Sequence, residues 1–284
     1  MRILLTNDDG VLAPGIAALA RAVAGRIDKC PSNEVREALI VAPDHNYSGM
    51  SSAVGDVFEL PTVRYERHWI SGAESIPAYG VQAPPALCAI IGALGSFGMK
   101  PDLVISGINA GANVGRSVLH SGTVGAILSA AQLGLSGLAV SVQWGEDVHY
   151  DLAAQLAIEV LDELFRAPSR TLLNLNVPNL TREHLRGVRR GRISTADVLM
   201  AAGPDAGGEP ISDKGELPLL LGAASPTVGD VSDEDEGDDG ALVVAGFASL
   251  TPIVGPHENT DASLDDVIHT ALGVISRHLV VGAP

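Results

Sequence analysis

The sequence predicts an α/β fold built on a doubly wound, mostly parallel sheet. Short apolar runs that fit buried strands alternate with longer amphipathic stretches that fit helices. Hydrophobic residues make up 46% of the 284 residues, yet aromatic residues make up only 4%, so the core consists mainly of small and branched aliphatic side chains. This composition suits helices packed on both faces of a buried sheet.

The first strand is expected at 2–6, followed by the turn Asn7–Gly10 and a helix that begins near Pro14. The same order then recurs along the chain. Further strands are expected at 38–42, 102–106, 138–142 and 172–177, and further helices at 84–95, 123–134 and 151–166.

Ligands of such sheets bind beyond the carboxyl ends of the strands, where the loops converge. Three loops there are polar and rich in glycine: Asn7–Gly10, Ala42–Ser52 and Gly107–Thr123. They are the expected location of a functional site.

The C-terminal part has a different composition. Residues 201–240 are rich in Gly, Pro, Asp and Glu, and the acidic run at 230–239 is expected to be a solvated loop, with a calcium or partner site as the alternative. The apolar segment 215–223 is expected to be a strand or hairpin arm that packs on a neighbouring subunit. The expected divisions are a catalytic core at 1–195, an extension or hairpin with an acidic loop at 196–245, and a returning strand with a C-terminal helix at 246–284.

Charge and hydropathy exclude several classes of protein. A net charge of −16, from 34 acidic and 18 basic residues, argues against binding a nucleic acid polymer. A small phosphorylated substrate is compatible with this charge if a bound cation supplies the positive centre. No apolar stretch approaches the ~20 residues of a membrane helix, so we expect no membrane contact and a cytoplasmic protein. Cys30 and Cys88 lack a metal-binding pattern and are expected to be reduced thiols.

Asp8 and Asp9 directly follow the first strand, in a turn that can direct both carboxylates to one point. Two such charges repel unless a cation lies between them. Alone, the motif would more often be a simple β-turn. Ser48 and the asparagines Asn109 and Asn113 in the other two loops add oxygen donors, which suit Mg²⁺, Mn²⁺ or Ca²⁺, although either asparagine could instead cap its loop.

Ser121, Gly122 and Thr123 immediately precede the apolar helical stretch that starts at 123. The free backbone N–H groups of a helix N-terminus can bind an anion such as phosphate. The alternative is simple capping of the helix by these side chains. A cation and a helix N-terminus at one edge of the sheet would hold a phosphoryl group from two sides.

Five motifs in order resemble the SurE family of nucleotidases: TNDDG at 6–10, VAPD with SG at 41–49, PDLVISGINAGANVG at 101–115, HSGTVGA at 120–126 and LLNLNVP at 172–178. The resemblance implies a Rossmann-like core, and hydrolysis of nucleoside 5′- and 3′-monophosphates with a divalent cation, Mg²⁺ or Mn²⁺. It also implies a homodimer or homotetramer assembled through a C-terminal extension. The family's metal ligands correspond to Asp8, Asp9, Ser48 and Asn109, and its phosphate-binding residues to Asn113, Ser121, Gly122 and Thr123.

The chain departs from the family pattern in several places. The family usually has Gly-Thr-Pro-Ala-Asp-Cys where this chain has Gln82-Ala83-Pro84-Pro85-Ala86-Leu87, and Ser129 replaces an acidic residue. These changes lie outside the ligand set. Two alternatives to a nucleotidase are therefore a phosphatase for a sugar phosphate or another specialised metabolite, and a noncatalytic nucleotide-binding protein.

The expected reaction is attack on phosphorus by a water molecule that the cation activates. Attack by Asp8 itself, through an aspartyl-phosphate, is the alternative, and Asp8 and Asp9 are the expected catalytic residues in either case. His120 is a candidate acid for the leaving group, although a lone histidine before a helix more often has a structural role.

Overall fold

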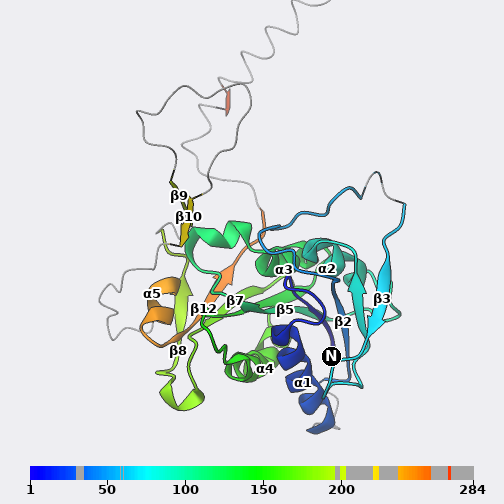
Figure 1. The fold of residues 1–284 in the computed structure, drawn as a ribbon, viewed down its shortest axis with the longest axis horizontal. Coiled ribbons are helices and arrows are strands. Elements are labelled where there is room, and N and C mark those ends of the chain that lie inside the picture. The colour runs from blue at the N-terminus through cyan, green and yellow to red at the C-terminus, as the bar shows by residue number, and fades with distance from the viewer. Residues whose placement is uncertain are drawn as a thin grey trace, which may run out of the picture. The chain divides into compact units, whose positions relative to one another are not determined.

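The computed structural model describes residues 1–29, 35–57, 59, 61–195, 199–202, 220–223, 236–256 and 268–269. Within them, ten strands form one sheet in the order β11-β8-β12-β7-β6-β5-β1-β2-β4-β3 (Figure 1). The strands are β1 Arg2–Thr6, β2 Glu37–Pro43, β3 Tyr65–His68, β4 Ala78–Val81, β5 Leu103–Ala110, β6 Ser136–Val142, β7 Leu172–Val177, β8 Val188–Arg192, β11 Glu236–Asp238 and β12 Ala248–Ile253.

The sheet is mostly parallel, which confirms the predicted fold class. Only two of its strand pairs are antiparallel among the described residues: β12 with β7, and β3 with β4. The central strands β2, β1, β5, β6 and β7 are parallel neighbours. Their carboxyl ends therefore meet at one edge of the sheet.

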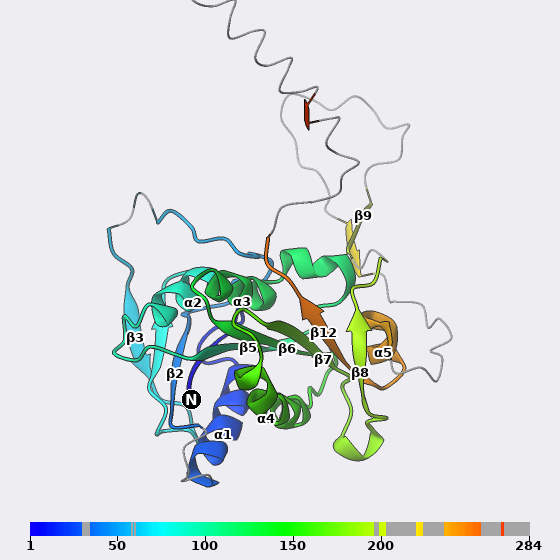
Figure 2. The same cartoon turned by 180° about the vertical axis from the view of Figure 1, so that it is seen from behind.

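Helices cover both faces of the sheet (Figures 1 and 2). One face carries α1 and α4, and the other carries α2 and α3. The helices are α1 Pro14–Lys29, α2 Pro85–Ala93, α3 Gly122–Gln132, α4 Tyr150–Arg166 and α5 Asp239–Val244, with 3-10 turns η1 Gly115–His120 and η2 Arg182–His184.

Strand β1 shows why its apolar run is buried on both sides. Ile3 and Leu5 point to the core beneath α1 and α4, whereas Leu4 points to the core beneath α2 and α3. All three side chains have no exposed surface. The alternation of side chains along a strand thus supplies both cores from one short segment.

Strands β3, β4 and β8 were not predicted from the apolar runs of the sequence. Strands β3 and β8, with the sequences YERH and VRRGR, are polar and partly exposed, so they lack the apolar run that marks a buried strand. Strand β4 is short, with four residues, and it continues the sheet beyond β2.

The C-terminal region differs from the expected solvated loop where the structure describes it. Glu236–Asp238 forms β11 against β8, and Asp239 is fully buried at the start of α5. Strands β11 and β12 are part of the ten-stranded sheet, and α5 packs on β12 and β8. The rest of the acidic run, 230–235, lies outside the described residues.

Of the expected hairpin arm, Leu220–Ala223 is strand β10, which pairs antiparallel with β9, Leu199–Ala202. Residues 215–219 and Cys30 lie outside the described part, as does the expected C-terminal helix apart from the helical residues 268–269. Met1–Ile253 and Val254–Pro284 are two compact units.

Cys88 is a buried free thiol, and burial raises its pKa. Among the described helices, none has the length and apolar character needed to cross a membrane.

Candidate metal and phosphate site

The two predicted carboxylates lie at the sheet edge where β1 ends. Thr6 is in register with Ser106 of β5, so Asp8 and Asp9 follow β1 beside the end of β5. Asp8 is buried, with 3% of its surface exposed, and Asp9 is partly buried. A hydrogen bond from the side chain of Asn7 to the carbonyl of Gly10, 2.9 Å long, closes the turn.

The loop after β2 is tied to both aspartates. The backbone N–H of Tyr47 donates to the carbonyl of Asp8 at 2.7 Å, and the Asn46 Nδ2 donates to Asp9 Oδ1 at 3.3 Å. Asn46 Oδ1 in turn accepts from the backbone N–H of Ser48 at 2.8 Å. Ser48 itself is exposed, next to this bridge.

Asn109 lies at the end of β5, where the register with β6 shifts. Its Nδ2 donates to the carbonyl of Gly111 at 2.7 Å, which leaves the side-chain oxygen as the atom suited to binding a cation. The neighbouring backbone N–H of Ala110 lowers the pKa of Asp9, so the end of β5 lies beside that carboxylate.

The start of α3 faces Asp8. The Thr123 hydroxyl donates to Asp8 Oδ1 at 2.6 Å, and Thr123 has no exposed surface. A methyl group built on Gly122 would lie 2.8 Å from the Cβ atom of Asp8, so only glycine allows this approach. The side chain of Ser121 caps the helix by accepting from the backbone N–H of Val124 at 3.1 Å.

The two aspartates differ in what controls their protonation. Burial raises the pKa of Asp8, while the Thr123 hydroxyl and the backbone N–H groups of Gly122 and Thr123 lower it. Burial, and then the negative charge of Asp8, raise the pKa of Asp9 to about 6. The site thus brings two partly desolvated carboxylates together, and a bound cation would relieve the repulsion between them.

Asn113 is held by the sheet rather than left free in its loop. Its backbone N–H donates to Asn176 Oδ1 at 2.7 Å, and its carbonyl accepts from Asn174 Nδ2 at 2.8 Å and from Asn176 Nδ2 at 3.1 Å. Its own Nδ2 donates to the hydroxyl of Ser141 at 2.8 Å. The next turn of this loop is fixed by Asp239, whose carboxylate accepts from the backbone N–H of Gly115 at 3.1 Å.

The structure therefore gathers Asp8, Asp9, Asn109, Gly122 and Thr123, and ties the loop of Ser48 to them. The sequence analysis did not identify Asn46, Asn174, Asn176 or the clamping role of Asp239. The sequence pattern around three of these residues could have indicated their roles. Asn46 lies two residues before Ser48, which favours an Asx turn, and Asn174 and Asn176 share one face of a strand whose other residues are apolar.

The donor set fits a hard divalent cation. It combines two carboxylates with a hydroxyl and an amide oxygen, the ligands that Mg²⁺ and Mn²⁺ accept. In the described part of the chain, no three His, Cys, Asp or Glu side chains gather as a metal site, so a zinc-type cluster is not found there.

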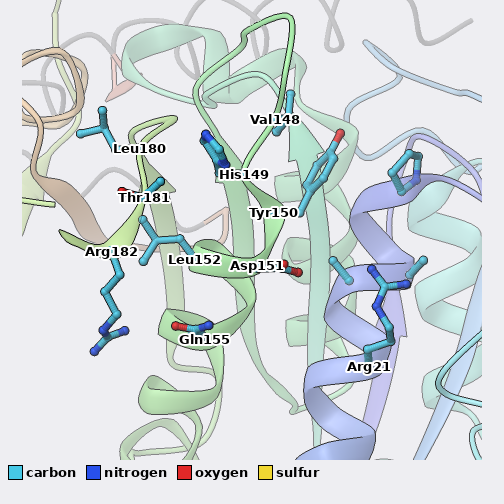
Figure 3. A pocket seen from close by; sticks show the side chains of 13 residues that line it. Arg21, Val148, His149, Tyr150, Asp151, Leu152, Gln155, Leu180, Thr181 and Arg182 are labelled. Atoms are coloured by element: carbon cyan, nitrogen blue, oxygen red, sulfur yellow. The ribbon is translucent and has the colours of Figure 1, made fainter. Parts of the chain in front are cut away.

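A pocket of about 530 Å³ lies between α1 and the start of α4 (Figure 3). Arg21, His149 and Tyr150 line it, and none of the predicted cation ligands does. Tyr150 links the pocket to the site, because burial and the charge of Asp9 raise the pKa of its hydroxyl.

Comparison with known proteins identifies the family. The sequence profile described as "Survival protein SurE" matches residues 3–198. The chain belongs to the SurE family. The "5'/3'-nucleotidase SurE" of Cronobacter sakazakii is 35% identical over 282 residues, which cover 98% of this chain and 96% of the relative. The protein with the same description from Klebsiella pneumoniae is 36% identical over 256 residues, which cover 89% of this chain and 90% of that one.

A solved SurE structure also matches. The crystal structure of the SurE protein from Aquifex aeolicus superposes with a TM-score of 0.69 at 25% identity, and the match covers 95% of this chain and 99% of that chain. The described part of the chain thus has the SurE fold.

Proposed function

We propose that this SurE protein is a phosphomonoesterase that hydrolyses nucleoside 5′- and 3′-monophosphates with the help of Mg²⁺ or Mn²⁺. The observation that carries the proposal is the position of Asp8, which lies between Asp9 and the N-terminus of α3. The names of the relatives, 5'/3'-nucleotidase, support the same activity.

In this proposal Asp8, Asp9, Ser48 and Asn109 hold the cation. A cation bound there would offset the charge of the phosphate and lower the pKa of a water molecule. The segment Ser121–Thr123, in which the N–H groups of Gly122 and Thr123 already face Asp8, would favour binding of the remaining phosphate oxygens through the positive end of the α3 dipole and the Ser121 hydroxyl. Asn113 would contribute by holding the loop that borders this space, since its backbone is clamped by β7.

Water is the proposed nucleophile. Thr123 already bonds one oxygen of Asp8, and the other lies close to Gly122, so the carboxylate is held as a ligand rather than directed into open space. Phosphate covalently bound to Asp8 after an acid quench would instead assign the attack to Asp8. His120 is exposed at the end of η1, and a histidine there has access to a leaving group in solvent.

The test is phosphate release from AMP and p-nitrophenyl phosphate, with EDTA and then with added Mn²⁺ or Mg²⁺. We expect EDTA to abolish turnover and either cation to restore it, and Asp8→Asn to remain inactive at saturating cation. Asp28→Asn, an exposed carboxylate on α1, is the matched control and should behave as the wild type. Full activity without a cation would refute the proposal, and AMP binding without turnover would leave a noncatalytic nucleotide-binding protein.

We also propose a homo-oligomer assembled through the segment that contains β9 and β10. These two strands pair with each other and not with the ten-stranded sheet. A two-stranded ribbon is marginally stable alone, which favours its packing on another chain. Light scattering at micromolar concentration should give the mass of a dimer or tetramer, and a monomer would contradict this part of the proposal.

A further inference from the structure

A second pocket of about 530 Å³ lies on the α2 side of the site, between α2 and the loop that follows Ser52. Leu87 and Ile91 of α2 line it, four residues apart and thus on one face of the helix. The opposite wall contains Val54 and Val63. The pocket is therefore mainly apolar, unlike the polar edge that holds the aspartates.

Aromatic rings close one end of this pocket. Tyr65 and Phe97 both line it, and their rings meet edge to face with centroids 5.2 Å apart. Phe97 stacks in turn on Tyr79 at 4.5 Å, which fixes its orientation. Such rings favour contact with another aromatic ring through offset or edge-to-face packing.

The pocket adjoins the phosphate site through two prolines. Pro84 lines the pocket, and the next residue, Pro85, lies so close to Gly122 that a methyl group on that glycine would be 3.0 Å from its Cγ atom. The same methyl group would be 2.9 Å from Asp8 Oδ2. Pro85 thus packs beside Gly122 and Asp8, and the residue before it lines the pocket.

The loop that contains Ser48 and Ser51 also connects the proposed site to the pocket. Ser51 is bound to η1 and lies against Gly125 of α3, and the chain then continues into the wall at Val54. This is the loop that begins with Ser48. Both walls of the pocket therefore start at the proposed cation and phosphate site.

We propose that this leaving-group pocket receives the uncharged, aromatic alcohol portion of a phosphomonoester whose phosphate lies at Asp8 and the start of α3. This inference rests on the proposed phosphatase function and adds a preferred class, esters of alcohols that carry an aromatic ring, to the nucleoside monophosphates proposed above. Most of the described lining is apolar; Ala83 adds no side-chain hydrogen bond, and the uncharged polar side chains apart from Tyr65 are Thr62, Gln82 and Ser96. The described lining includes Asp56 and neither lysine nor arginine, so a second anionic group is disfavoured.

The test compares two substrates of matched chemical reactivity, ethyl phosphate and 2-phenylethyl phosphate, with Mn²⁺ present. Their alcohols are of similar acidity, so a difference in kcat/KM reports recognition of the ring. We expect 2-phenylethyl phosphate to be favoured at least about tenfold, since even small apolar additions in a fitted pocket are discriminated by this much. AMP should also have a lower kcat/KM than the phenylethyl ester.

Two variants test the location. Leu87→Gln places a polar group on the wall, and Ser96→Trp fills the pocket from an exposed position, so the second variant loses no buried contact of the core. Both should lower the preference for the phenylethyl ester severalfold. Leu94→Gln is the matched control, because Leu94 is 56% exposed at the end of the same helix and does not line the pocket.

Binding is measured separately from turnover. Calorimetry with 3-phenylpropylphosphonate and propylphosphonate, which cannot be hydrolysed as esters, should show the same preference and the same effect of the variants. Binding preference without hydrolysis of any ester would uphold the pocket and overturn the phosphatase proposal. Equal affinity for the two phosphonates, or a preference that both variants retain, would overturn the pocket.

Discussion

The hydroxyl of Thr123 donates a 2.6 Å hydrogen bond to Asp8 Oδ1, which joins the first turn of α3 to the loop after β1. Both residues are buried, so the bond is shielded from water. A buried carboxylate without partners would favour its neutral form, and this bond with the N–H groups of the helix N-terminus opposes that effect. The segment proposed to bind phosphate thus also positions the proposed cation ligand.

Thr123→Val should lower kcat/KM by about tenfold to a hundredfold, because valine keeps the shape of the side chain and loses a hydrogen bond to a charged group. It should also raise the Mn²⁺ concentration needed for half-maximal activity. Thr123→Ser restores the hydroxyl and should recover most of both values. If valine leaves the Mn²⁺ requirement unchanged, the bond does not position Asp8 for a cation.

Gly122→Ala should lower activity at least about tenfold and cost roughly 1–3 kcal/mol of stability. The new methyl group would lie 2.8 Å from the Cβ atom of Asp8, so the aspartate or the start of α3 must move. Gly25→Ala in α1 is the control, since a methyl group there meets nothing within 4 Å. That change should leave activity intact and stabilise the helix by about 0.5–1 kcal/mol. Equal activity of the two variants would contradict the close approach.

The cation-free protein should lose stability as pH rises from about 4 to 6. The pKa of Asp9 is about 6 in the folded chain, above its ordinary value of 3.8, so the folded state retains a proton that the unfolded state has lost. The stability gained from that proton is complete at low pH and is lost as pH passes the folded pKa. Because Asp9 is only partly buried, we expect a change of about 1–2 kcal/mol.

Asp9→Asn isolates this effect, since the amide keeps an acceptor for Asn46 and carries no charge. In EDTA the variant should resist urea better than the wild type at pH 7.5 and equally well at pH 4. With Mn²⁺ the order at pH 7.5 should reverse, because only the wild type binds the cation tightly. A variant that is less stable than the wild type in EDTA at pH 7.5 would show that the two carboxylates do not repel.

The sequence located the central strands because buried strands have a distinctive apolar pattern, although β5 continues to Ala110, four residues beyond its predicted end. The run before Asp8 and the run before Asn109 identified β1 and β5, and parallel pairing then brought the two loops to one edge. The exposed edge strand β3, Tyr65–His68, carries no such pattern, although it pairs with the strand that follows it in the chain, β4, Ala78–Val81. Individual hydrogen bonds between distant residues could not be predicted from the sequence either. The position of Thr123 before an apolar stretch indicates a helix cap, yet its hydroxyl donates to Asp8, 115 positions away.

The burial of Asp239 also could not be predicted from the sequence. It belongs to a run of acidic residues that suggests solvent exposure, yet its side chain is fully buried. Its carboxylate accepts from the backbone N–H groups of Gly115 at 3.1 Å, Ser194 at 3.1 Å and Gly240 at 2.9 Å. Three separate segments, the loop after β5, the end of β8 and the start of α5, thus meet at one side chain.

Asp239→Ala should cost about 2–4 kcal/mol, because it leaves three buried N–H groups without their acceptor. It should also lower kcat/KM, since Gly115 ends the loop that carries Asn113 and that directly follows the end of β5, where Asn109 lies. Asp238→Ala is the matched control: the adjacent side chain is exposed and makes no capping hydrogen bond to α5, so both values should change little. Urea unfolding and phosphate release measure the two effects. If both alanine variants unfold at the same urea concentration, Asp239 does not hold these segments together.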